Sequence, residues 1–201
     1  MKRLWPGWLL CVLTAGLLAY MAFIETPAIS ALLGGLKLPD AAPLGYDEDA
    51  GRALFAAFAA DLKLAREQGL QSASEAYVAL HAGYDLIFPP MLAASLGFCA
   101  YAALYLRPEN TQTPRHVRIG LGLVLALAFA YLGCDFVENA VADAMFGPKA
   151  LGLAFNDQFV FVLRVLTIGK FTTAALAFVL IAGLGISGWR SRRQSQVTAD
   201  P

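Results

Sequence analysis

Four long runs of apolar residues divide the chain, and polar residues gather between these runs and at their ends. The runs cover about 5–24, 84–106, 119–141 and 158–189. Because a helix rises about 1.5 Å per residue, about 20 apolar residues are enough to cross a hydrocarbon layer of about 30 Å. The pattern therefore predicts an all-α protein: a four-helix transmembrane bundle that forms a single membrane domain over residues 1–201.

The first run has a second interpretation as a secretory signal peptide, since Lys2 and Arg3 come directly before it. A signal peptide has an apolar core of about 7–15 residues and a small-residue cleavage site. The run is longer than such a core, and no clear cleavage site ends it. We therefore interpret it as an uncleaved membrane anchor.

The segment of about 26–83, between the first two runs, is predicted to form a helical cap outside the cytoplasm. Its first part, 26–47, holds three prolines and a pair of glycines, a composition that disfavours a regular helix. From Asp49, apolar residues recur at helical spacing, and this helix should stop near Gly69. A second helix should begin at Ser72, where Ser-Ala-Ser-Glu has the form of a capping box. We expect the two helices to pair as a hairpin-like cap on the bundle.

Two interpretations are open for the start of the second span. The helix from Ser72 can run straight into it, in which case Pro89 and Pro90 interrupt a continuous helix. The carbonyls of Asp85 and Leu86 would then lack their helical partners. Alternatively, the two prolines begin the span, because proline is tolerated in the first turn of a helix.

Composition agrees with a membrane protein, and the placement of charge predicts its orientation. Charged residues make up 15% of the chain and hydrophobic residues 58%, whereas soluble domains have typically about 25% charged residues. Lys and Arg favour cytoplasmic loops. The segment 25–80 carries eight acids and four cations, while the two chain ends and the second-to-third loop carry eight cations and two acids. We therefore predict a bacterial plasma (inner) membrane protein with both termini cytoplasmic. These eight cations are Lys2, Arg3, Arg107, Arg115, Arg118, Arg190, Arg192 and Arg193, and the two acids are Glu109 and Asp200.

Ionisable residues within or beside the apolar runs indicate where a functional site could lie. A charge at the middle of a bilayer costs at least about 2.5–3.5 kcal/mol, so its depth matters. Counted along each helix from the basic end, these residues fall in one layer near the outer boundary of the membrane. They are Glu25, Asp85, Asp135, Glu138, Arg164 and Lys170.

The third and fourth runs each place polar residues on one helix face. Asp135 and Glu138 are three residues apart, with Asn139 beside them, and residues at this spacing are neighbours on a helix. Thr167 and Lys170 have the same spacing in the fourth run. The two faces carry opposite charge, so the sequence predicts ion pairs between these helices.

The predicted pairs join Asp135 or Glu138 to Lys170 or Arg164, and two interpretations of them are open. The layer could be a structural ion-pair network that locks the helices together, or it could line a polar pocket that opens outward. Pairing alone explains the charges, so the carboxylates are candidates for a ligand site and no more. The candidate residues are Asp85, Asp135, Glu138, Asn139, Arg164, Thr167 and Lys170.

Metal and cofactor chemistry find little support in the sequence. His81 lies four residues before Asp85, on the outer side, and is a candidate metal ligand together with the carboxylates. A zinc site would need a second histidine or closely spaced cysteines, but His116 is on the predicted cytoplasmic side. We therefore predict no metal and no cofactor. The cysteines match no metal or redox spacing and predict no disulfide framework; they are Cys11, Cys99 and Cys134.

Three short motifs carry a resemblance to a known family. They are Tyr84-Asp85-Leu-Ile-Phe88-Pro89, Asp135-Phe-Val-Glu138-Asn139 and Thr167-Ile-Gly-Lys170. Over roughly its last three spans, the chain resembles a bacterial family of small, uncharacterised four-span integral membrane proteins. The resemblance implies that these polar residues act together, and it implies no activity. The segment 26–80 departs from the compact pattern of that family.

Three classes of function are open for this chain. The first is a structural or interaction subunit, which would bind a protein partner or form a homo-oligomer within the lipid bilayer. The second is a protein that binds or transports a small molecule or a lipid. The third is a membrane-embedded enzyme that uses the Asp135 and Glu138 carboxylates. We expect the first class, because no nucleophile elbow or phosphate loop is present. No basic block indicates a nucleic-acid partner.

Overall fold

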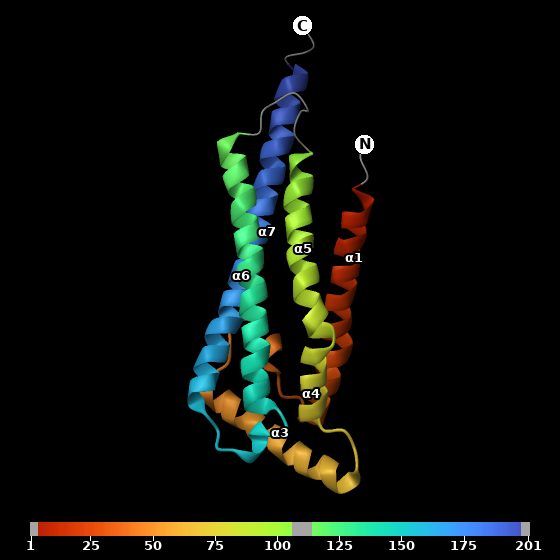
Figure 1. Ribbon diagram of the computed structural model, residues 1–201, viewed down its shortest axis with the longest axis vertical. Helices are drawn as coiled ribbons and strands as arrows, with labels where there is room; N and C mark the ends of the chain where they lie inside the picture. Colours follow the sequence, from red (N-terminus) through yellow and green to blue (C-terminus); the bar gives the residue numbers. More distant parts are fainter. Residues whose placement is uncertain (1–3, 106–113, 198–201) are drawn as a thin grey trace.

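The computed structural model describes residues 4–105 and 114–197, and within these ranges the chain is helical and contains no strand. Figure 1 shows the helices arranged as a bundle with one helix lying across its end. This confirms the predicted all-α class. The helices are α1 (Trp5–Tyr20), α2 (Thr26–Leu32), α3 (Glu48–Gln68), α4 (Ala73–Ala82), α5 (Tyr84–Leu104), α6 (Arg115–Phe146) and α7 (Asp157–Val197).

Four helical stretches in the described ranges are long and apolar enough to cross a membrane: Trp5–Leu32, Ala73–Leu104, Arg115–Phe146 and Asp157–Arg193. All four extend beyond the ranges expected from hydropathy at one end or both, because polar turns continue the helices. The start of α1 and the end of α7 lie at one end of the bundle, and α3 lies at the other (Figure 1). Among the residues used to predict the orientation, Lys2, Arg3, Arg107, Glu109 and Asp200 lie outside the described residues.

The first span does not end near residue 24. A single π-helical turn, Met21–Glu25, joins α1 to α2, and the helix continues to Leu32. The expectation of no regular helix over 26–47 is therefore wrong for 26–32. Pro27 lies in the first turn of α2, where its missing N–H costs little, and the wide π turn before it relieves the backbone. The remainder, 33–47, forms a loop with one 3₁₀ turn at Pro39–Ala41.

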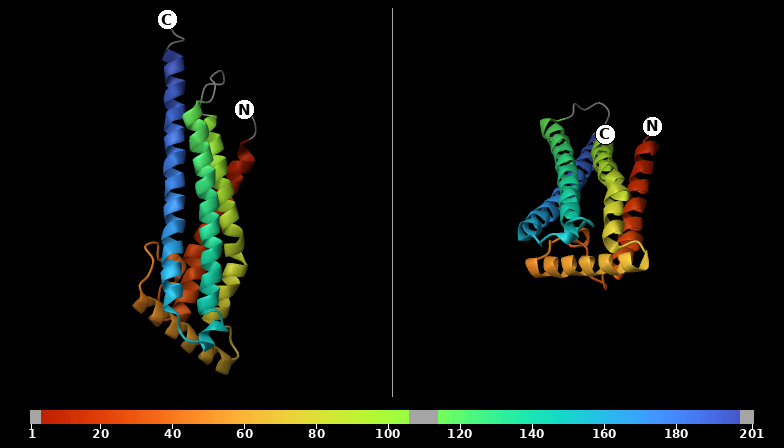
Figure 2. Two further views of the ribbon diagram at one scale, coloured as in Figure 1. Left: turned by 60° about the vertical axis from the view of Figure 1, so that its left-hand side comes forward. Right: turned by 60° about the horizontal axis from the view of Figure 1, so that its bottom comes forward.

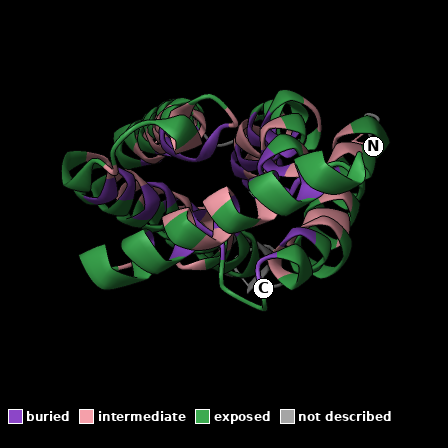
Figure 3. Cartoon of the chain, turned by 90° about the horizontal axis from the view of Figure 1, so that it is seen from below, coloured by how far each residue is buried: buried purple, intermediate pink, exposed green. Residues whose placement is uncertain are grey.

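Helix α3 forms the cap and crosses the end of the bundle, as two further views show (Figure 2). Asp47 caps its first turn by accepting a hydrogen bond from the backbone N–H of Ala50 at 2.9 Å. Gly69 ends it in the left-handed conformation, with φ of 67°. Both ends agree with the sequence. Seen along the bundle, the outer face of α3 is exposed, while its inner side faces the ends of the other helices (Figure 3).

Helix α4 does not pair with α3 as a hairpin, which corrects that expectation. Its Ser72 capping box forms as predicted, but α4 continues into α5 and lengthens the second span. The break between the two lies at Gly83, with φ of −109° and ψ of −101°. Pro89 and Pro90 lie inside α5, in its second turn. The second span therefore starts before the prolines, and a glycine makes the interruption.

A cluster of aromatic rings holds the cap on the bundle. Phe58 of α3, Tyr77 of α4 and Phe146 of α6 are each fully buried. The Phe58 ring centre lies 5.6 Å from that of Tyr77 and 5.2 Å from that of Phe146. Such pairs contribute about 0.5–1.5 kcal/mol beyond the apolar area that they bury. This packing fixes the position of α4 against α6.

Helix α1 packs mainly along α5 and is otherwise largely exposed. Two small polar contacts join them. Thr14 and Ser95 are hydrogen-bonded at 2.9 Å, and the Sγ atoms of Cys11 and Cys99 lie 3.7 Å apart. Together with Cys134, both cysteines are free thiols. The contact between Cys11 and Cys99 could not be predicted from sequence spacing, because the two residues lie on different helices.

Candidate functional site

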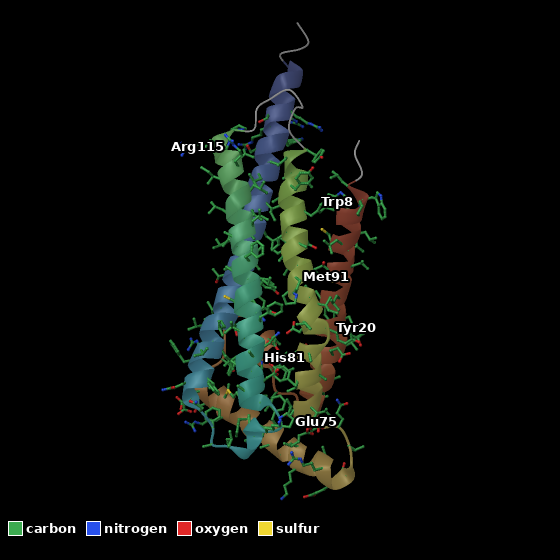
Figure 4. The ribbon with its side chains drawn as sticks, in the orientation of Figure 1. Trp8, Tyr20, Glu75, His81, Met91 and Arg115 are labelled. Carbon is green, nitrogen blue, oxygen red and sulfur yellow. The ribbon has the colours of Figure 1, made fainter. Side chains whose placement is uncertain are left out.

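Polar side chains from five parts of the chain, the loop 33–47 and helices α4, α5, α6 and α7, meet inside the bundle near the end that α3 covers. His81 belongs to this region, whereas Arg115 lies at the opposite end (Figure 4). Eight of the members are less than a tenth exposed; Asp40 and Asp143 are partly exposed. We call the set the polar cluster: Asp40, Tyr77, His81, Asp85, Asp135, Glu138, Asn139, Asp143, Thr167 and Lys170.

The ion pairs between α6 and α7 form as their helical spacing predicts. The Lys170 ammonium lies 3.0 Å from Asp135 Oδ1 and in direct contact with Glu138 Oε2. Thr167, one turn before Lys170, donates a hydrogen bond to Glu138 Oε1. The three-residue spacing on each helix thus brings two acids opposite one cation and one hydroxyl. All four side chains are buried.

Other predicted members of the layer behave differently. Arg164 is exposed and makes no ion pair in the described part of the chain, so of the two candidate cations it is Lys170 that pairs with the acids. Arg164 instead packs on Gly45, where a Cβ atom would lie 2.5 Å from Arg164 Cγ. Glu25 also lies outside the cluster and accepts a hydrogen bond from Tyr20. Asp85 is buried, with 7% of its surface exposed, and it lies within range of the charges on Asp135 and Lys170.

His81 lies between two carboxylates. Its Nδ1 is 2.6 Å from Asp143 Oδ1, and its Nε2 is 3.7 Å from Asp40 Oδ2. The first distance is a hydrogen bond and the second is an ion-pair distance only. Within residues 4–105 and 114–197, no group of three or more His, Cys, Asp or Glu side chains could hold a metal ion. His81 therefore has carboxylate partners that account for its burial.

Asp40 is the member that sequence reasoning missed. The 3₁₀ turn Pro39–Ala41 places it against the bundle, and the two residues just before it, Leu38 and Pro39, are buried. Tyr77 donates a hydrogen bond to Asp40 Oδ2 at 2.9 Å, and Lys170 lies 3.9 Å from Oδ1. Through this one carboxylate, the loop 33–47 contacts three charged or polar groups of the spans.

The Asp40 carboxylate is strongly stabilised in its charged form. Burial by itself would raise its pKa, but the interaction with His81 and the charge of Lys170 outweigh burial. They hold the pKa of Asp40 well below its usual range. A depressed pKa contributes stability that is complete above the unfolded value, near 3.9, and is lost only as pH falls toward the folded value.

Replacing Asp40 tests this directly. We expect Asp40→Asn to lower the thermal stability of the detergent-solubilised protein by the same amount at every pH from 5 to 8. The difference from wild type should shrink only below about pH 4. Asp49→Asn, an exposed acid at the start of α3, is the control and should change little. A difference that varies between pH 5 and 8 would show that His81 loses its proton there and that the ion pair depends on it.

Asp143 was also not identified from the sequence as a member of the polar layer, although its spacing on the helix indicated it. It lies four residues after Asn139 on α6, so it continues the polar face by one turn. Its partner, His81, could not be inferred, because α4 and α6 are distant in sequence. Asp143 and His81 together extend the polar cluster toward the cap.

The polar cluster is incompletely satisfied. Within the described chain it contains five carboxyl groups against two basic side chains, Lys170 and His81. Several of its buried atoms have no hydrogen-bond partner. A buried polar atom without a partner costs about 1–3 kcal/mol, and more if it is charged. These atoms are Asp40 Oδ1, His81 Nε2, Asp135 Oδ2 and Asn139 Oδ1, besides Glu138 Oε2, which contacts Lys170.

The arrangement can accept hydrogen bonds and positive charge. The family resemblance suggested by the three motifs stays a prediction. Comparison with protein-family models, curated proteins and solved structures finds no match for the chain.

Proposed function

We propose that this chain is a bacterial plasma-membrane protein that binds a small organic cation at the polar cluster. Both termini would lie in the cytoplasm and the cap outside, because the basic residues gather at the end opposite α3. Among the described residues, Arg115, Arg118, Arg190, Arg192 and Arg193 belong to that end. The cluster would then face the extracytoplasmic side.

The imbalance of charge in the cluster carries this proposal. Five carboxyl groups surround two bases, and acceptor atoms of Asp135 and Asn139 are buried without partners. In a medium of low dielectric constant an uncompensated charge is very costly, so the surplus must be neutralised by protons or by a bound cation. A purely structural ion-pair layer has no need of a surplus of acids.

An organic ammonium fits the acceptors better than a metal ion does. A metal needs several ligands at fixed short distances, and no such group of side chains is found in the described chain. An ammonium group donates hydrogen bonds in several directions, so it can use acceptors that lie further apart. The unpartnered Asp135 Oδ2 and Asn139 Oδ1, one helical turn apart on α6, are acceptors of that kind.

Calorimetry with butylammonium tests the proposal. We expect the purified protein in nanodiscs to bind butylammonium at pH 7.5, and its affinity to fall as pH is lowered because protons compete for the same carboxylates. Asp135→Asn should weaken binding at least about tenfold, since charged hydrogen bonds contribute about 1.5–3 kcal/mol. Glu67→Gln, an exposed acid on α3, should bind like wild type.

Neutral butanol, at the same concentrations, is the second control and should give no heat of binding. Circular dichroism and size exclusion would show that the Asp135→Asn variant is folded. If folded wild-type protein binds no butylammonium at any pH from 5 to 9, the cluster is a structural network and the chain is better described as a structural or interaction subunit.

A further inference from the structure

A pocket of about 470 Å³ lies outside the spans, between the loop 36–47 and the first turns of α3. Small-molecule sites have volumes of about 300–1,000 Å³ and are mostly apolar. The lining here is largely aliphatic and includes Leu36, Leu44 and Leu54. Lys37 and Asp47 bring one charge of each sign to the lining, so the pocket itself has no net charge among its described residues.

The loop backbone around Asp40 lies between this pocket and the polar cluster. Ala41 and Ala42 line the pocket, while the residue just before them, Asp40, faces the cluster and contacts Tyr77. Tyr46 belongs to both sides. It lines the pocket, and its buried hydroxyl has no hydrogen-bond partner.

The Tyr46 hydroxyl also lies within range of the charges on Asp40 and Glu138. Burial, and then these two charges, raise the pKa of Tyr46 well above its usual range, so the phenol stays neutral and remains a hydrogen-bonding group. An unpartnered neutral hydroxyl between an apolar pocket and a set of carboxylates is a group that can orient a ligand spanning both.

We propose that the ligand is an amphipathic organic cation, with its ammonium group among the acceptors of the polar cluster, its alkyl part in the pocket beside α3, and the Tyr46 hydroxyl between the two. This inference rests on the proposed function, because the cluster supplies the charge recognition. It adds that recognition also depends on an apolar body. The lining is mostly aliphatic, and each methylene buried against it gains free energy.

A chain-length series tests the inference. We expect affinity to rise about three- to fourfold for each added methylene from ethylammonium to hexylammonium, measured by calorimetry in nanodiscs. Ala53→Trp should remove most of this dependence, because Ala53 is exposed and lines the pocket, so the indole would fill it. Ala56→Trp is the matched control. It is exposed on the same helix outside the lining and should keep the full dependence.

The outcomes separate the two proposals. If ethylammonium and butylammonium both fail to bind, the proposed function is wrong. If they bind but affinity does not change with chain length, the cation site stands and this inference is wrong. It is also wrong if Ala53→Trp and Ala56→Trp give the same chain-length dependence, because partition into the lipid of the nanodisc would then explain it.

Discussion

Lys170→Met is expected to destabilise the protein more than any other single substitution in the polar cluster. Lys170 is buried, with a side chain only 8% exposed, and contacts Asp135 and Glu138 directly. Removing one partner of a buried ion pair typically costs about 3–5 kcal/mol, because the other charge is left uncompensated. Here two carboxylates lose their cation at once. Thermal unfolding in detergent, followed by circular dichroism, measures the effect.

A double substitution separates the lost pair from lost packing. Lys170→Met combined with Glu138→Gln should recover part of the stability, because the second change removes one of the stranded charges. Lys63→Met, an exposed lysine on α3, is the control and should stay within about 0.5 kcal/mol of wild type. If Lys170→Met is as stable as wild type, or if Glu138→Gln restores nothing in combination, the pairs described here do not hold the helices together.

Helical spacing was enough to predict the part of the site that lies on α6 and α7. Residues three apart share a helix face, and acids on one helix faced a cation on the next. Hydropathy was equally sufficient for the four spans, since an apolar run of about 20 residues has few alternatives. Arg164 shows the limit of this reasoning. Its depth matched that of the acids, but the loop at Gly45 covers its helix face instead.

The contribution of the loop could not be predicted, because it depends on contacts that are distant in sequence. Asp40 meets Tyr77, His81 and Lys170 only after the chain has folded back over the bundle. Prolines and glycines identified a loop but gave no information on where it packs. The break at Gly83 was missed for a related reason: the neighbouring prolines were a stronger local signal.

Phe58→Ala is expected to have the second large effect, by releasing the cap. Phe58 is fully buried against Tyr77 and Phe146, and truncating a buried phenylalanine costs about 3–5 kcal/mol. The cap lies beyond the spans, where water drives apolar burial. We therefore expect α3 to separate from the bundle while the spans stay folded, and limited proteolysis would detect cleavage within 48–68.

Loss of the cap should also weaken ligand binding at the polar cluster and the adjoining pocket. Tyr77 packs on Phe58 and donates its hydrogen bond to Asp40, and α3 supplies one wall of the pocket. Butylammonium affinity should therefore fall in Phe58→Ala, with a greater loss for hexylammonium than for ethylammonium. Leu64→Ala removes an apolar side chain of the same helix that is 52% exposed, and it should leave both protease resistance and affinity unchanged. If Phe58→Ala stays as protease-resistant as Leu64→Ala, the aromatic cluster does not hold the cap on the bundle.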